Sequence, residues 1–117
     1  MARLSTHVLD ISRGKPAQNV VIDLHFCFSG ERKHLNTVVT NADGRTDEPL
    51  ISGDRLQAGV YELTFHAGDY FRRVAVELAT PPFLDEVVIR FGLADPAGNY
   101  HVPLLLSPYG YSTYRGS

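Results

Sequence analysis

The sequence predicts an all-β sandwich, because short segments of alternating polar and apolar residues recur along the chain and turns rich in Gly and Pro separate them. We expect about eight strands of this kind and at most one short helix. The length of 117 residues fits one domain over residues 1–117, and the hydrophobic fraction of 44% is ordinary for a globular protein. The sequence contains no internal repeat and no low-complexity segment.

The first part of the chain carries the two clearest strand signals. Residues 4–11 alternate between an inner face that includes Leu4 and Val8 and an outer face that includes His7. Residues 20–28 alternate even more regularly. The expected core-facing residues of this second strand are Val20, Ile22, Leu24, Phe26 and Phe28, and those expected to face away are Asp23, His25 and Cys27.

The middle of the chain mixes turns with shorter strands. Residues 29–34 are interpreted as a polar connection, and residues 35–40 as the third β-rich run. Residues 41–44, with the sequence Asn-Ala-Asp-Gly, are a strong turn signal because Asn, Asp and Gly tolerate positive φ angles. Residues 46–57 are expected to form a loop with at most one short strand, and residues 59–65 another strand.

The last part of the chain contains the one candidate helix, at residues 67–74, where Asp69 could cap a short turn. Residues 83–91 form a further predicted strand. Residues 100–117 are predicted to run strand, Ser-Pro-Tyr-Gly turn, strand, and they are too apolar and aromatic for a frayed end. The apolar edge strand expected at residues 109–114 invites pairing with a second subunit.

Charge and cysteine content exclude several classes of function. The net charge of −2 gives no electrostatic footprint for nucleic acid or for an anionic membrane. No stretch approaches a membrane span, and the first residues lack the apolar run of a secretory signal. The single cysteine, Cys27, leaves no internal disulfide and fits a reducing compartment, so we expect a cytoplasmic protein.

Five histidines are the first candidates for chemistry. His25, His34 and His66 are interpreted as surface residues, because imidazole is commonly of intermediate burial. His7 and His101 lie on the outer faces of two predicted strands, so together they could act as an acid–base couple near neutral pH. For either of these two histidines alone, a satisfied and partly buried structural role is the competing interpretation.

Other reactive groups lack a specific motif. A zinc site would need a third ligand near the two histidines, and the sequence offers none, so we expect no metal. Ser107 and Ser117 do not lie in a Gly-x-Ser-x-Gly elbow, and no Gly-rich phosphate loop is present. Arg45 directly follows the turn at residues 41–44. It is either a solvated arginine or a guanidinium presented to an anionic or imide-bearing ligand.

Five motifs, spread from residue 4 to residue 117, are shared with a known family. They are LSTHVLD with SRGKPA (residues 4–17), TNADGR (40–45), GDYF (68–71), FLDEVVIRFGLADP (83–96) and YHVPLLLSPYGYSTYRGS (100–117). On these motifs the chain resembles the 5-hydroxyisourate hydrolases, the transthyretin-related enzymes of urate breakdown. The terminal Tyr-Arg-Gly-Ser separates these hydrolases from the hormone-binding transthyretins, which end differently. Many relatives carry a histidine where Asn99 stands.

The resemblance implies a transthyretin-like sandwich of two sheets and a short helix, without a metal or a cofactor. It also implies a homotetramer, a dimer of dimers, with the active sites in a channel at the dimer–dimer interface. Catalytic roles then fall to His7, Arg45, His101 and Ser117, and substrate binding to His7, Arg45, Tyr114, Arg115, Gly116 and Ser117.

The reaction implied is hydrolysis of the cyclic amide of 5-hydroxyisourate to 2-oxo-4-hydroxy-4-carboxy-5-ureidoimidazoline, a step in the degradation of urate to allantoin. Our hypothesis is that His7 helps to activate the water, His101 positions or protonates, and Arg45 holds the substrate. Tyr114 and the tail would close over the ring. The sequence leaves open which histidine is the base and which is the acid.

Two alternatives belong to other classes. The first is a non-catalytic, transthyretin-like carrier that binds a small hormone-type ligand in the same channel, although such pockets use few ionisable groups. The second is a structural sandwich module, in which His7, Arg45 and His101 would be unrelated in space.

Overall fold

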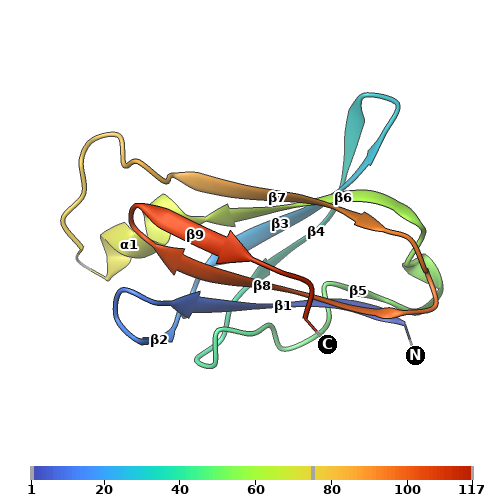
Figure 1. Cartoon of the computed structure of the whole chain (residues 1–117), viewed down its shortest axis with the longest axis horizontal. Coiled ribbons are helices and arrows are strands. Elements are labelled where there is room, and N and C mark those ends of the chain that lie inside the picture. Colours follow the sequence, from blue (N-terminus) through green and yellow to red (C-terminus); the bar gives the residue numbers. More distant parts are fainter. Residues whose placement is uncertain (1, 75, 117) are drawn as a thin grey trace.

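Two β-sheets face each other, with one α-helix at one end of the sandwich (Figure 1). The computed structural model describes residues 2–74 and 76–116. The first sheet has the strand order β2-β1-β8-β9, with β5 also paired to β1, and the second has the order β4-β3-β6-β7. The predicted all-β sandwich with a short helix is therefore confirmed.

The elements have the following bounds. The first sheet comprises β1 (Arg3–Asp10), β2 (Lys15–Pro16), β5 (Ile51–Ser52), β8 (Asn99–Ser107) and β9 (Gly110–Thr113). The second comprises β3 (Val21–Phe28), β4 (Glu31–Val39), β6 (Gly59–His66) and β7 (Glu86–Leu93). The helical segments are α1 (Ala67–Arg73) and a 3₁₀ turn, η1 (Gly53–Arg55).

The pairing of β1 with β8 positions the candidate histidines. These strands are parallel, with Ser5 opposite His101 and His7 opposite Pro103. Successive residues of a strand point to opposite faces of the sheet, so the two strands alternate in phase. Leu4 and its even-numbered neighbours on β1 are buried between the sheets. The odd-numbered residues of β1 and β8, including both histidines, therefore share the outer face, as the alternation predicted.

Two residues near the end of β3 differ from the predicted pattern. Ile22 and Leu24 are buried as expected, but Phe28 is 46% exposed and Cys27 is buried. The register between β3 and β4 shifts between Leu24 and His25, so strict alternation does not continue across this point. The prediction that Phe28 faces the core and Cys27 faces away is therefore wrong.

The connection between β3 and β4 is shorter than predicted. It consists of Ser29 and Gly30, with φ angles of 49° and 76°. Two residues with positive φ form the tight hairpin turn that matches the twist of the flanking strands. Because the chain reverses within two residues, the polar stretch from Glu31 onward belongs to β4 rather than to a connection.

The helix and β7 also begin differently from the prediction. The N-cap of α1 is His66, without a side-chain hydrogen bond, and Asp69 lies inside the first turn, where its carboxylate is 2.8 Å from the Arg72 guanidinium. β7 starts at Glu86, while Phe83 lies outside the strand, 70% exposed, with its ring 5.9 Å from that of Tyr109. The terminal hairpin of β8 and β9 is confirmed.

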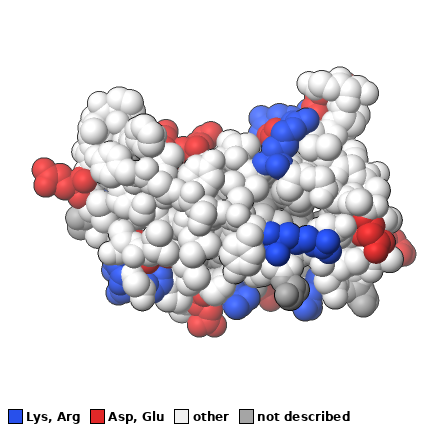
Figure 2. Space-filling model, viewed as in Figure 1, with Lys and Arg blue, Asp and Glu red and all other residues white. Residues whose placement is uncertain are grey.

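Charged side chains are scattered over the face seen in Figure 2, with acidic and basic groups interspersed around a broad uncharged area. Comparison with Figure 1 places this area in front of β8 and β9. Within the described residues, no helix is long and apolar enough to cross a membrane.

Candidate active site

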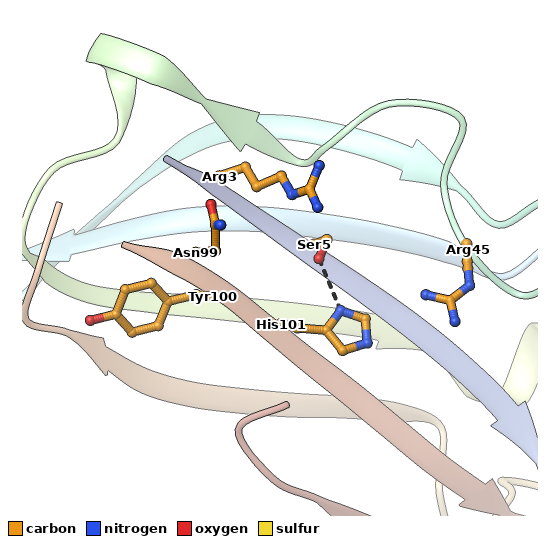
Figure 3. A pocket seen from close by; sticks show the side chains of 6 residues that line it. All are labelled: Arg3, Ser5, Arg45, Asn99, Tyr100 and His101. Atoms are coloured by element: carbon orange, nitrogen blue, oxygen red, sulfur yellow. Dashed lines mark hydrogen bonds between the residues drawn. The ribbon is translucent and has the colours of Figure 1, made fainter. Parts of the chain in front are cut away.

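A polar pocket of about 320 Å³ lies where β1 and β8 begin. Figure 3 shows its side chains, with Arg45 on one side of the His101 ring and Ser5 on the other. The lining residues are Arg3, Ser5, Arg45, Asn99, Tyr100 and His101. The pocket thus combines two guanidinium groups with an imidazole, a hydroxyl and an amide.

His101 is held in this pocket by the parallel register. Its Nδ1 atom lies 2.9 Å from the hydroxyl of Ser5, the residue opposite it on β1. Partial burial lowers the pKa of His101, and the positive charge of Arg45, that of His7 when it is protonated, and that of Arg3 lower it further. An imidazole among cations is more costly to protonate, so His101 is neutral at physiological pH.

His7 lies beside the same pocket and is oriented by the turn that precedes Arg45. Its Nε2 atom is 2.9 Å from the main-chain oxygen of Asp43. A carbonyl oxygen only accepts hydrogen bonds, so Nε2 carries the hydrogen and Nδ1 of the neutral ring keeps a lone pair. Burial and then the charge of Arg45 lower the pKa of His7, against a smaller raising effect of Asp43. His7 is therefore an available base.

The side chain of Asn41 organises the turn that carries Arg45. Its Oδ1 accepts hydrogen bonds from the main-chain nitrogens of Asp43 at 2.9 Å and Arg45 at 3.2 Å. Gly44 has a φ of 74°, and a Cβ atom there would collide with the main-chain oxygen of Val8. The main-chain nitrogen of Val8 also donates to the Gly44 oxygen at 2.8 Å. The turn is thereby fixed against β1, next to His7.

The tail reaches the pocket through Gly116. Its main-chain nitrogen donates to the His101 oxygen at 2.7 Å, and a Cβ atom at Gly116 would lie 2.6 Å from the Cδ2 atom of the His101 ring. Only a glycine fits against the imidazole in this arrangement. The structure therefore brings His7, Arg45, His101 and Gly116 together, and their roles in a site stay a prediction.

Tyr114 and Arg115 do not line the polar pocket. They line a neighbouring hollow of about 230 Å³ that also includes Tyr100 and Val102. The guanidinium carbon of Arg115 lies 4.1 Å from the centroid of the Tyr100 ring, and Tyr114 is 60% exposed. Tyr100 lines both hollows and so separates them. Ser117, the last predicted site residue, lies outside the described residues.

The sequence interpretation missed three pocket residues, Arg3, Ser5 and Tyr100. Alternation could have indicated Arg3 and Ser5, because both share the odd-numbered face of β1 with His7. Among the described residues, no group of three or more His, Cys, Asp or Glu side chains could hold a metal ion.

Comparison with known proteins shows the family of this chain. The family model described as "HIUase/Transthyretin family" matches residues 4–116. The chain belongs to this family. A curated relative, "5-hydroxyisourate hydrolase 2" of Rhizobium meliloti (strain 1021), is 59% identical over 98% of this chain and 96% of its own length. The resemblance seen in the sequence motifs is thus confirmed.

Solved structures with the fold of the HIUase/Transthyretin family are similar to this chain along nearly its whole length. A 5-hydroxyisourate hydrolase of Klebsiella pneumoniae has a TM-score of 0.82 and 38% identity, with all of both chains covered. An (S)-allantoin synthase has a TM-score of 0.94 and 42% identity, and its alignment covers 99% of this chain and 44% of the synthase. Sea bream transthyretin, solved with thyroxine, has a TM-score of 0.86 and 30% identity, with 98% of this chain and 95% of transthyretin covered.

Proposed function

We propose that this protein hydrolyses 5-hydroxyisourate, opening its cyclic amide to give 2-oxo-4-hydroxy-4-carboxy-5-ureidoimidazoline in the degradation of urate to allantoin. The observation that carries the proposal is the grouping of His7 and His101, both with lowered pKa values, around Arg45. The 59% identity to a relative named as a 5-hydroxyisourate hydrolase supports the same reaction. Residues 1–117 act as one hydrolase domain, and the reaction uses no cofactor and no metal.

His7 supplies the base in this reaction. Its Nε2–H is engaged by the Asp43 oxygen, so Nδ1 takes a proton from water as the water oxygen attacks the ring carbonyl carbon. The guanidinium of Arg45 stabilises the negative charge that develops on the carbonyl oxygen. Both histidines keep a neutral form to lower pH than an isolated imidazole, because burial and the nearby arginine oppose protonation.

His101 acts on the other half of the reaction. When the Ser5 hydroxyl donates to Nδ1, the Nε2 atom of His101 carries the hydrogen and faces the pocket as a donor. As the carbon–nitrogen bond breaks, the leaving nitrogen receives the proton that His7 took from the water, which restores the neutral base. The neutral His101 positions the substrate through its Nε2–H, and the new carboxylic acid ionises. Gly116 packs against the ring of His101 and keeps it in place. Ser117, Tyr114 and Arg115 complete the site around the substrate in the assembled protein.

The active form is a homotetramer, a dimer of dimers, with sites at the dimer–dimer interface. Three features support this assembly: the pocket opens on the outer face of the first sheet, β9 is an edge strand, and the area in front of β8 and β9 is largely uncharged (Figure 2). Exposed aromatic residues such as Tyr111 and Tyr114 lie on or next to this edge. Unprotected edge strands are normally paired or covered.

The single cysteine supports a cytoplasmic location of the enzyme, because a reducing compartment keeps thiols free.

The rival function is that of a carrier, as in the transthyretin solved with thyroxine. The pocket argues against it, since its lining contains two arginines and a histidine, and carrier pockets are mostly apolar. The hydrolase relative is also 59% identical, compared with 30% for the transthyretin.

One assay separates the two functions. Urate and urate oxidase generate 5-hydroxyisourate in solution, and its near-ultraviolet absorbance is followed with and without the protein. Faster decay that scales with protein concentration is expected, and thyroxine is expected not to bind at micromolar concentration. Unchanged decay together with thyroxine binding would establish the carrier instead.

A further inference from the structure

Arg3 occupies a specific place in the pocket that the proposed reaction leaves without a role. It is the first residue of β1 and lies opposite Asn99, the first residue of β8. Both line the pocket together with Ser5, Arg45 and His101, and Arg3 extends along β1 toward Ser5 (Figure 3). The pocket is therefore flanked by two guanidinium groups, one from a strand and one from a turn.

These two guanidinium groups have donors free for a ligand. Several other arginines are engaged; for example, Arg32 and Arg90 both pair with Glu62, at 3.0 and 2.8 Å. Within the described residues, neither Arg3 nor Arg45 makes a side-chain hydrogen bond or an ion pair. Two pocket arginines with free donors favour an anionic ligand, because a guanidinium group binds a carboxylate through bidentate hydrogen bonds.

Positive and negative side chains are distributed unevenly around the pocket. Arg3 contributes to the lowering of the pKa of His101, after burial and the charges of Arg45 and His7. Among the described lining residues there is no carboxylate. Asp47 and Glu48 line an adjoining hollow of about 250 Å³, which shares Arg3 and Arg45 with the pocket. The acidic groups therefore lie on one side, and the side toward His101 is positive.

The proposed reaction creates one anionic group. Water oxygen adds to the amide carbonyl carbon, the carbon–nitrogen bond breaks, the nitrogen takes a proton, and the carbonyl carbon becomes a carboxylate. Arg45 is already assigned to the oxyanion of the intermediate, so the second guanidinium is free for the carboxylate as it forms.

We propose that Arg3, with the amide of Asn99 beside it, forms a carboxylate-binding subsite that selects planar ring ligands carrying a carboxylate. The proposal rests on the proposed function for the identity of the carboxylate, which is that of the ring-opened product. The expected preference for charged over uncharged ligands rests only on the arginines that line the pocket.

A matched pair of stable compounds tests the subsite. Orotate is a planar imide ring with a carboxylate, and uracil is the same ring without it. Their dissociation constants are measured from the NMR shift of the His101 imidazole in the full-length protein. The wild type should bind orotate more tightly than uracil, and Arg3→Gln should weaken orotate about tenfold, which corresponds to about 1.4 kcal/mol, while leaving uracil unchanged. Added salt should weaken orotate selectively, because the contact is ionic.

Two further variants control the comparison. Arg55→Gln removes the same charge from an exposed residue that lines a different hollow, and should leave both constants unchanged. Arg3→Lys keeps the charge without the planar fork and should recover part of the orotate affinity. Equal binding of orotate and uracil by the wild type, or unchanged orotate binding by Arg3→Gln, would overturn the proposal.

The two proposals fail in different ways. Orotate selectivity that depends on Arg3, in a protein that does not accelerate the loss of 5-hydroxyisourate, would keep the subsite and refute the hydrolase. Rapid hydrolysis with wild-type KM and product inhibition in Arg3→Gln would keep the hydrolase and refute the subsite.

Discussion

The Nε2 atom of His7 lies 2.9 Å from the main-chain oxygen of Asp43, so the turn before Arg45 determines which nitrogen of His7 carries the hydrogen. One short segment thereby orients a base and fixes the main chain of the arginine beside it. Asn41 is the residue that holds this segment, through two main-chain hydrogen bonds accepted by its side chain.

Replacement of Asn41 by Ala should therefore act on catalysis from outside the pocket. The turn loses its internal acceptor, so His7 and Arg45 lose their fixed positions, and we expect kcat to fall on the order of 10²-fold, as for misplaced reacting groups. The fraction of the Nε2–H tautomer of His7, measured by ¹⁵N NMR, should fall in parallel.

Asn36→Ala is the matched control for the Asn41 variant. The Asn36 amide donates to the Leu50 oxygen at 3.0 Å, so this change also removes an asparagine hydrogen bond, but away from the site. Asn41→Ala with wild-type kcat and an unchanged His7 tautomer would contradict the role of the turn.

The pH dependence follows from the lowered pKa values of His7 and His101. Burial and then the charge of Arg45 place both below the ordinary value of 6.5. The neutral imidazoles that the reaction needs should thus persist below pH 6.5 in the wild type. Arg45→Gln removes a positive neighbour, so it should raise both values, as followed by NMR titration of the imidazole protons. Titration of both rings above 6.5 in the wild type, or no upward shift in the variant, would contradict this electrostatic account.

Gly116→Ala should damage the site without unfolding the protein. The added methyl group would lie 2.6 Å from the His101 ring, so the ring or the tail must move. We expect a loss of turnover of about 10²-fold from the displaced ring. Gly92→Ala is the control, since a Cβ atom there meets nothing within 4 Å. Equal turnover by the two alanine variants would show that the tail does not position His101.

Tyr70→Phe should lower stability rather than activity. The Tyr70 hydroxyl donates to the buried carboxylate of Asp10 at 2.7 Å, and burial together with Asp10 raises the pKa of Tyr70 to about 12. Loss of this donor leaves one oxygen of a buried carboxylate without its partner, which costs about 1–3 kcal/mol. Urea unfolding at one protein concentration measures the change, and an unaltered midpoint would contradict it.

Alternation along the strands was enough to predict the shared outer face of His7 and His101, and turn chemistry was enough to place Arg45 beside a rigid turn. Alternation also places Arg3 and Ser5 on this outer face, but it does not show that they line a pocket with His101. Their role depends on the parallel pairing of β1 with β8, which joins residues 96 positions apart, such as Ser5 and His101. A strand-start arginine has no local pattern that distinguishes it from a solvated one.

The tail was only partly predictable for a related reason. Gly116 reaches His101 as expected, but Tyr114 and Arg115 follow the last strand, where alternation no longer sets the direction of a side chain. In this chain Arg115 packs on Tyr100 instead of facing the histidines. At the end of β3, the register shift likewise reversed the predicted positions of Cys27 and Phe28.

The central claim is that His7 and His101 together carry out the hydrolysis of 5-hydroxyisourate. The most direct test is the rate of loss of freshly generated 5-hydroxyisourate with the wild type and with His7→Ala and His101→Ala at equal concentration. Each substitution should lower kcat by about 10²–10⁴-fold, the usual contribution of a general base or acid. Turnover by both variants at the wild-type rate would contradict the assignment of this site.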